Sequence, residues 1–171
     1  MYNASNISIS VIGLGYVGLP LAVALSNNFN VVGYDIDSIR TKDLNNSIDK
    51  TKEVSKNQLR KSLSGKLLIT SSFKLIKKSK VIIITLPTPI YKNKKPNLSF
   101  LKNITSKISK LDKSIKRLVI YESTVYPGLL REKLLPIFLK HNLKLNYDFY
   151  IGYSPERINP GDRNKTLSNV I

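Results

Sequence analysis

The chain contains Ile9-Ser-Val-Ile-Gly13-Leu-Gly15-Tyr-Val-Gly18-Leu-Pro-Leu-Ala22, and this stretch decides its fold. Three glycines in the pattern G-x-G-x-x-G join an apolar run to a segment of helical period. Gly13 permits a tight strand-to-helix turn, Gly15 lets a pyrophosphate approach the backbone, and Gly18 allows the helix to pack closely on the strand. Because unpaired N–H groups at the start of a helix favour negative charge, we expect this turn to bind an anion.

A second apolar run ends in Asp35, 17 residues after Gly18. A carboxylate at this place accepts hydrogen bonds from the ribose hydroxyls of adenosine and repels a 2′-phosphate, which favours NAD over NADP. Arg40 lies nearby and weakens that preference, since an arginine can accommodate the phosphate. The alternative for Asp35 is a residue that only forms the turn at the strand end. Asp37 is expected to cap the next helix.

Strand and helix patterns alternate along the rest of the chain. Runs rich in valine and isoleucine predict strands at residues 7–12, 31–35, 66–70, 80–85, 117–121 and 147–152. Segments of helical period predict helices at 16–28, 39–46, 53–63, 98–111 and 128–141, with one or two further turns at 72–78. The pattern predicts an α/β fold, a doubly wound Rossmann-type parallel sheet of about six strands in the order 3-2-1-4-5-6, with helices on both faces.

The domain boundary is expected near residue 152, so that residues 1–152 form the dinucleotide-binding domain. The tail at 153–171 is polar and carries Pro155 and Pro160, and no helical pattern closes it. We therefore expect this tail to be a loop that leads to a central helix and a C-terminal substrate domain outside the chain.

Composition and charge narrow the class of protein. The net charge of +17 could indicate a nucleic-acid partner, but the lysines are scattered over many helix faces without interleaved aromatic residues, so we expect none. The absence of cysteine excludes disulfides and thiolate metal sites, and no metal is expected. The apolar runs are too short to cross a membrane, and a cytoplasmic protein is the expectation.

Three later strand ends carry small polar side chains. These are Thr85-Leu-Pro-Thr88-Pro-Ile90, Glu122-Ser-Thr-Val-Tyr-Pro-Gly128 and Tyr153-Ser-Pro-Glu156-Arg-Ile-Asn-Pro160-Gly-Asp162. Ligands of doubly wound sheets bind at the carboxyl ends of the strands, so these segments are expected to line one crevice.

Together with the glycine turn, these motifs resemble the UDP-glucose/GDP-mannose dehydrogenase family in order and spacing. The resemblance extends from Ile9 to about Asp162. The segment at 154–162 is most similar to the branch that oxidises UDP-N-acetylhexosamines for surface polysaccharides. The UDP-glucose branch usually has a glutamate where this chain has Pro160.

The resemblance implies two successive NAD-dependent oxidations at C6 of a UDP-sugar, from CH₂OH to carboxylate. It implies that Glu156 is a general acid or base beside the substrate and that Thr124 helps to hold a water. The alternatives are that Glu156 is a surface acid paired with Arg157 or Arg163, and that Ser123 and Thr124 cap a helix. The implied NAD-binding residues are Gly13, Leu14, Gly15, Tyr16, Val17, Gly18, Asp35, Arg40, Thr88, Pro89, Ser123 and Thr124.

The family's second oxidation uses a cysteine nucleophile, and this chain has no cysteine. We therefore expect the chain to be inactive alone, and the complete enzyme to be a homodimer assembled largely through other parts. His141 is interpreted as a helix terminus rather than a catalytic base. Three alternatives remain, namely a free-standing dinucleotide-binding module without catalysis, a shorter Rossmann enzyme such as a hydroxyacid dehydrogenase, and a basic nucleic-acid-binding domain.

Overall fold

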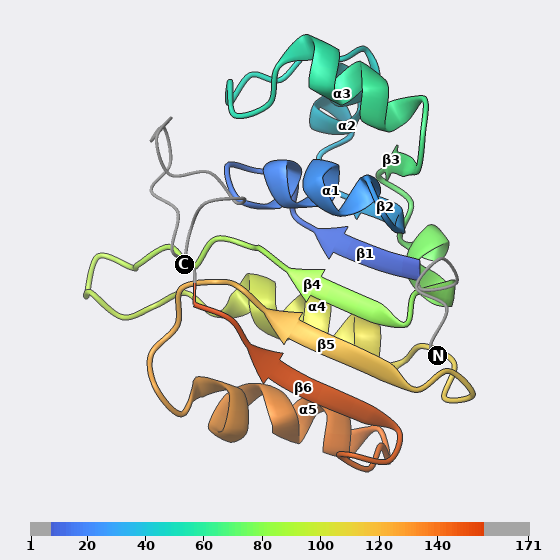
Figure 1. Cartoon of the computed structure of the whole chain (residues 1–171). Helices are drawn as coiled ribbons and strands as arrows, with labels where there is room; N and C mark the ends of the chain where they lie inside the picture. Colours follow the sequence, from blue (N-terminus) through green and yellow to red (C-terminus); the bar gives the residue numbers. More distant parts are fainter. Residues whose placement is uncertain (1–7, 156–171) are drawn as a thin grey trace.

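The sheet of this protein has six parallel strands in the order β3-β2-β1-β4-β5-β6. The structure is a computed structural model and describes residues 8–155. Figure 1 shows the carboxyl ends of the strands gathered along one edge of the sheet. The predicted order is confirmed. The strands are β1(Ser8–Ile12), β2(Asn30–Tyr34), β3(Leu67–Thr70), β4(Val81–Ile84), β5(Arg117–Tyr121) and β6(Phe149–Tyr153).

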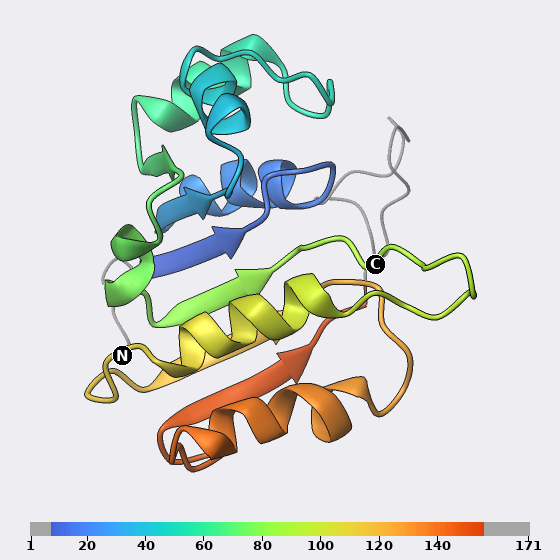
Figure 2. The same cartoon turned by 180° about the vertical axis from the view of Figure 1, so that it is seen from behind.

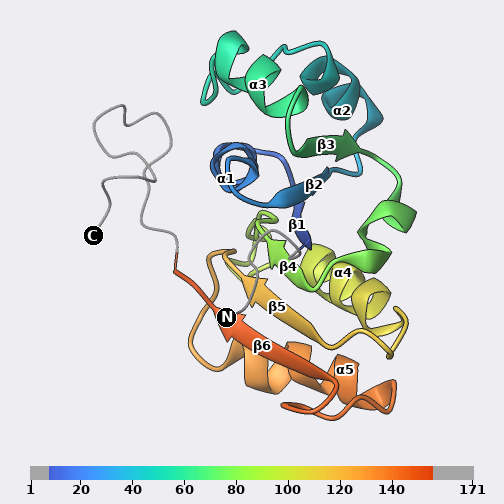
Figure 3. The ribbon, with the colours of Figure 1, turned by 45° about the vertical axis from the view of Figure 1, so that its right-hand side comes forward.

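Helices cover both faces of the sheet, as the alternating pattern predicts. Helices α1 and α3 contact each other on one face, whereas α4 and α5 contact each other on the opposite face (Figures 2 and 3). A 3₁₀ segment, η2(Phe73–Lys78), connects β3 to β4. The helices are α1(Gly18–Ser26), α2(Ser38–Asn45), α3(Lys56–Leu63), α4(Ser99–Ser109), the π-helical η3(Leu130–Leu134) and α5(Leu135–Lys140).

The core divides into two clusters, one on each face of the sheet. Alternate residues of a strand point to opposite faces, and accordingly Val11 and Ile83 belong to one cluster while Ile12 and Ile82 belong to the other. Strands buried on both faces need apolar residues at successive positions, which explains the unbroken run of β4. The sequence of β4 therefore lacks the alternation of apolar and polar residues that is typical of a sheet with one face in water.

Two pairs of buried hydroxyl groups lie in the core. The hydroxyl groups of Ser10 and Ser79 lie 2.6 Å apart, and so do those of Thr105 and Tyr121. Burial raises the pKa of Tyr121, although its hydrogen bond with Thr105 acts in the opposite direction. These pairs allow hydroxyls to lie inside the core without leaving a polar atom unsatisfied.

Helix ends follow the capping chemistry of the sequence. The Asp37 carboxylate accepts hydrogen bonds from the N–H groups of Ile39 and Arg40, which confirms its predicted role as the cap of α2. His141 is the C-terminal cap of α5, as predicted. Ser55 and Gln58 form a reciprocal capping box at the start of α3.

The last helical segment differs from the expected helix at 128–141. Gly128 has a φ of +89°, so its backbone is not helical, and helical structure begins only at Leu130. The first turn is a π-helix in which the Leu135 N–H donates to the Leu130 carbonyl. Pro136 then follows at the start of α5. A proline ring clashes with the carbonyl four residues earlier in an α-helix, and the wider π turn avoids this clash.

Candidate functional site

The turn after β1 contains the three glycines, and the structure gives each a different environment. A side chain at Gly18 would place its Cβ 1.8 Å from the Gly13 carbonyl oxygen and 2.4 Å from Thr85 Oγ1, so helix and strand could not approach as they do. Gly13 has a φ of +95° and lies against Leu86. Around Gly15, by contrast, no atom lies within 4 Å of the Cβ position. Only Gly15 leaves space that the protein itself does not fill.

The start of helix α1 faces this open space. Its N-terminal cap is Val17, which makes no side-chain capping bond, and its first turn contains no acidic residue. Tyr16 is exposed and Val17 is half-buried. Uncapped N–H groups beside an open glycine are what an anionic group needs in order to approach the backbone.

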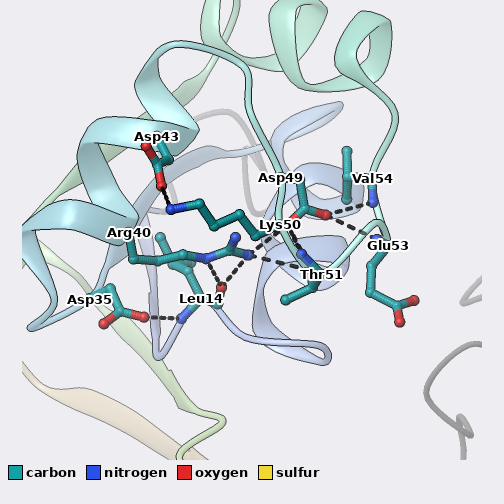
Figure 4. A network of polar contacts seen from close by, with 9 residues as sticks. All are labelled: Leu14, Asp35, Arg40, Asp43, Asp49, Lys50, Thr51, Glu53 and Val54. Atoms are coloured by element: carbon teal, nitrogen blue, oxygen red, sulfur yellow. Dashed lines mark hydrogen bonds and ion pairs between the residues drawn. The ribbon is translucent and has the colours of Figure 1, made fainter.

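Asp35 and Arg40 both form hydrogen bonds with the backbone of Leu14. Its N–H donates to Asp35 Oδ2 at 2.8 Å, and its carbonyl oxygen accepts from Arg40 Nε at 3.0 Å and Nη2 at 2.8 Å (Figure 4). The other oxygen of Asp35 accepts from the Asp37 N–H at 3.0 Å. Asp35 is half-buried. Each oxygen keeps a lone pair for a further donor.

Arg40 is paired with an acid that the sequence analysis missed. Its Nη2 lies 2.8 Å from Asp49 Oδ1, and the two side chains are 12% and 2% exposed. Asp49 lies in the segment between α2 and α3. Burial alone would raise the pKa of Asp49, but hydrogen bonds from Thr51, Val54 and Arg40 outweigh it and lower the pKa. The pattern Asp49-x-Thr51, an acid followed by a hydroxyl two residues later, indicates a local turn. It does not indicate that the acid pairs with Arg40.

The loops after β1 and β4 are joined at their bases. Thr85 Oγ1 donates to the carbonyl oxygens of Ile12, at 3.0 Å, and Gly13, at 2.7 Å. A side chain at position 18 would clash with the same hydroxyl. The glycine turn is therefore anchored to the neighbouring strand end rather than free to move by itself.

The loops after β4 and β5 are joined further out. Thr88 Oγ1 donates to the Thr124 carbonyl oxygen at 2.6 Å. Pro89 and Thr124 are exposed, and Thr88 is half-buried. Ser123 is 4% exposed, and its hydroxyl has no hydrogen-bond partner among the described residues. A buried hydroxyl without a partner is costly, and a ligand or a water at this edge would satisfy it.

A pocket lies beside this loop, where the sequence analysis expects part of a crevice. It is formed by residues 125–132 and Tyr153, at the carboxyl ends of β5 and β6. Its aromatic side chains, Tyr126 and Tyr153, are both exposed. Gly128, one of the lining residues, has a left-handed backbone with a φ of +89°.

The structure thus brings most of the predicted residues to one edge, the carboxyl edge of the sheet (Figure 1). The glycine turn meets Asp35 and Arg40 on one side and Thr85 on the other, and the next loop meets Thr124. Glu156 lies outside the described residues, so its predicted role as acid or base stays a prediction.

Residues 8–155 contain neither a metal-ligand cluster nor a membrane-spanning helix. No group of three or more histidine, cysteine, aspartate or glutamate side chains is placed to hold a metal ion in this part of the chain. The same residues contain no helix that is both long enough and apolar enough to span a bilayer.

Comparison with known proteins places this geometry in one family. Residues 7–170 match the model of the UDP-glucose/GDP-mannose dehydrogenase family, NAD binding domain. The chain is 43% identical to the UDP-N-acetyl-D-glucosamine 6-dehydrogenase of Pseudomonas aeruginosa, over 96% of the chain and 39% of that protein. The corresponding protein of Salmonella typhi is 41% identical, over 99% of the chain and 40% of its own length.

A solved structure agrees with the sequence relatives. The UDP-D-ManNAc dehydrogenase of Pyrococcus horikoshii superimposes with a TM-score of 0.82 at 35% identity, over 91% of this chain and 37% of the other. The chain spans about two fifths of the length of the curated relatives that it matches. From the match over nearly the whole sequence, the chain belongs to the UDP-glucose/GDP-mannose dehydrogenase family, of which it is an NAD-binding domain of Rossmann type.

Proposed function

We propose that this chain is the cofactor-binding part of a nucleotide-sugar 6-dehydrogenase that oxidises a UDP-N-acetylhexosamine to the corresponding uronic acid. Two relatives that exceed 40% identity are named UDP-N-acetyl-D-glucosamine 6-dehydrogenase, and these names support a UDP-N-acetylhexosamine as the substrate. The chain covers only about two fifths of those proteins, so the activity belongs to a longer protein.

The main support for the cofactor site is that the three glycines differ in the space around their Cβ positions. Protein atoms fill the space at Gly13 and Gly18, while the space at Gly15 is open and faces an uncapped helix end. The residues present fit a dinucleotide, because a pyrophosphate needs both the open backbone and the free N–H groups. The backbone from Leu14 to Val17 would hold the pyrophosphate, and Asp35 would accept the ribose hydroxyls.

The second half of the cofactor site is proposed at the loops after β4 and β5. Thr88 and Pro89 would line the nicotinamide-ribose side, and the unpartnered hydroxyl of Ser123 would find a partner there. Thr124 would help to hold a water beside the reacting carbon. NAD supplies the hydride acceptor for the C6 carbon in each of the two oxidations. Glu156 would exchange the accompanying proton with the substrate or orient the attacking water.

The cofactor site is tested by titrating the 171-residue chain with NADH and following the ligand's fluorescence. Gly15→Ala should weaken NADH binding at least about tenfold, because a methyl group would occupy the approach to the pyrophosphate. Its unfolding free energy should stay near that of the wild type, since the new Cβ meets no protein atom within 4 Å.

Gly152→Ala is the matched control for this experiment. Its Cβ also meets nothing within 4 Å, and it lies on β6, three strands from β1. This variant should bind NADH as the wild type does. Unchanged NADH affinity in Gly15→Ala would show that the pyrophosphate does not lie on this turn.

The catalytic part of the proposal has a separate readout. With UDP-N-acetylglucosamine and NAD, the chain alone should form no uronic acid, because the second oxidation needs a cysteine nucleophile that the chain does not contain. Formation of uronic acid by the purified chain would show that the second oxidation uses another nucleophile.

A further inference from the structure

Arg40 does not occupy the position of a free, solvent-facing cation. Two of its nitrogens, Nε and Nη2, are engaged with the Leu14 carbonyl oxygen, and Nη2 also lies 2.8 Å from Asp49 Oδ1. The third nitrogen, Nη1, is buried and has no hydrogen-bond partner within residues 8–155. The whole guanidinium group is thus turned toward the protein.

Asp49 is itself rigidly fixed. Its Oδ1 accepts hydrogen bonds from the N–H and the hydroxyl of Thr51, at 3.0 and 2.7 Å. Its Oδ2 accepts from the N–H groups of Glu53 and Val54, both at 3.0 Å (Figure 4). With its side chain 2% exposed and four donors from its own loop, the carboxylate is preorganised to receive Arg40.

We propose that Asp49 is a specificity-determining residue, which neutralises Arg40 and holds it on the Leu14 carbonyl so that the enzyme discriminates against the 2′-phosphate of NADP. This inference rests on the proposed binding of a dinucleotide at the glycine turn. Asp49 acts through Arg40 and touches no cofactor itself.

The charges around Asp35 support this role. An arginine near the ribose-binding acid is the group that accommodates a 2′-phosphate in NADP-dependent Rossmann domains. Here the positive charge of Arg40 is balanced at 2.8 Å by Asp49, whereas Asp35 accepts only backbone N–H groups and forms no ion pair with the residues described. The adenosine end of the site therefore presents an unbalanced negative charge, which repels a phosphate.

The central experiment measures the dissociation constants of NADH and NADPH for the wild-type chain and for Asp49→Asn. The amide keeps an oxygen that can accept hydrogen bonds in the loop, but it no longer balances Arg40. The ratio of the NADPH constant to the NADH constant should fall at least about threefold, because the 2′-phosphate adds charge close to the released cation. Adding Arg40→Met to Asp49→Asn should return the ratio to the wild-type value.

The control is Asp43→Asn. Asp43 also pairs with a cation, Lys50 at 2.6 Å, but its side chain and that of Lys50 are 21% and 67% exposed. This variant loses one acid and one ion pair without releasing Arg40. Its cofactor ratio should equal that of the wild type.

A second variant keeps the test sharp should Asp49→Asn not fold. Asp49→Ser also removes the charge that balances Arg40, and it should lower the cofactor ratio as Asp49→Asn does. An unchanged ratio in a folded Asp49→Ser would overturn the inference. So would equal weakening of both cofactors in a folded Asp49→Asn.

Failure of the wild type to bind either cofactor would overturn the proposed function and the inference together. Normal NADH binding with an unchanged ratio in Asp49→Asn would overturn the inference alone.

Discussion

The hydroxyl of Thr88 donates a 2.6 Å hydrogen bond to the carbonyl oxygen of Thr124, and this bond joins the loops that follow β4 and β5. The two residues are 36 positions apart in the chain. Thr88 therefore has a structural role in addition to the proposed contact with the cofactor: it fixes the distance between two loops that both line the proposed nicotinamide side.

Thr88→Val should separate these loops without changing the size of the side chain. We expect the unfolding free energy to fall by about 1 kcal/mol, the usual net value of a hydrogen bond, and NADH to bind several-fold more weakly. Thr88→Ser keeps the hydroxyl and should behave nearly as the wild type in urea unfolding and NADH titration. Equal behaviour of the valine and serine variants would show that the bond does not matter.

Gly18→Ala should be far more damaging than an ordinary glycine-to-alanine change. The added Cβ would lie 1.8 Å from the backbone oxygen of Gly13, which cannot move away as a flexible side chain could. Alanine normally favours a helix, yet we expect a loss of at least about 3 kcal/mol or failure to fold. Urea unfolding measures it. A variant of wild-type stability would contradict the close packing of α1 on the turn.

The fold could be predicted from the sequence because each element carries a local signal. The run Val81–Ile84 is apolar at every position, as a strand buried on both faces requires, and the glycine turn marks where β1 gives way to α1. The order of the strands followed from the topology that alternating strands and helices adopt in doubly wound sheets. The π turn of η3 was not predictable in this way, because it depends on how Pro136 fits into a helix that is already packed.

The candidate site was predictable in its residue types but not in its pairings. Asp35 and Thr88 were singled out as ligand contacts, and the structure adds bonds to Leu14 and Thr124 that no periodicity reveals. Asp49 was missed altogether. Its partner lies nine residues earlier on a helix, and only the folded path of the chain brings the two together. The division at residue 152 and the expected homodimer stay predictions.

Asp35→Ala should separate a cofactor effect from a capping effect when it is compared with Asp37→Ala. Loss of the Asp35 carboxylate removes the proposed ribose acceptor and the bond to the Leu14 N–H, so NADH should bind at least about tenfold more weakly. Asp37→Ala removes the cap of α2 and should cost about 1 kcal/mol of stability with little effect on NADH. NADH titration and urea unfolding of both variants provide the measurements. Unchanged NADH affinity in Asp35→Ala would refute the ribose assignment.

The stability of the chain should also depend on the ionisation of Asp49. Hydrogen bonds from Thr51, Val54 and Arg40 outweigh the effect of burial and lower its pKa below the ordinary value of 3.8. A depressed pKa in the folded state means that the ionised form stabilises the fold above the unfolded pKa, and that this contribution is lost as the pH falls through the folded pKa.

The free energy of unfolding should therefore decrease as the pH is lowered from 6 toward 3. Asp49→Asn cannot lose the same contribution, so the gap in stability between it and the wild type should be widest near pH 6 and should narrow on acidification. Urea unfolding of both proteins across this range measures the gap. Asp43→Asn again serves as the control, because it removes the acid of an ion pair that includes neither Arg40 nor Asp49. A gap that stays constant from pH 6 to pH 3 would mean that Asp49 stabilises the segment between α2 and α3 by its shape and hydrogen bonds, and not by its charge.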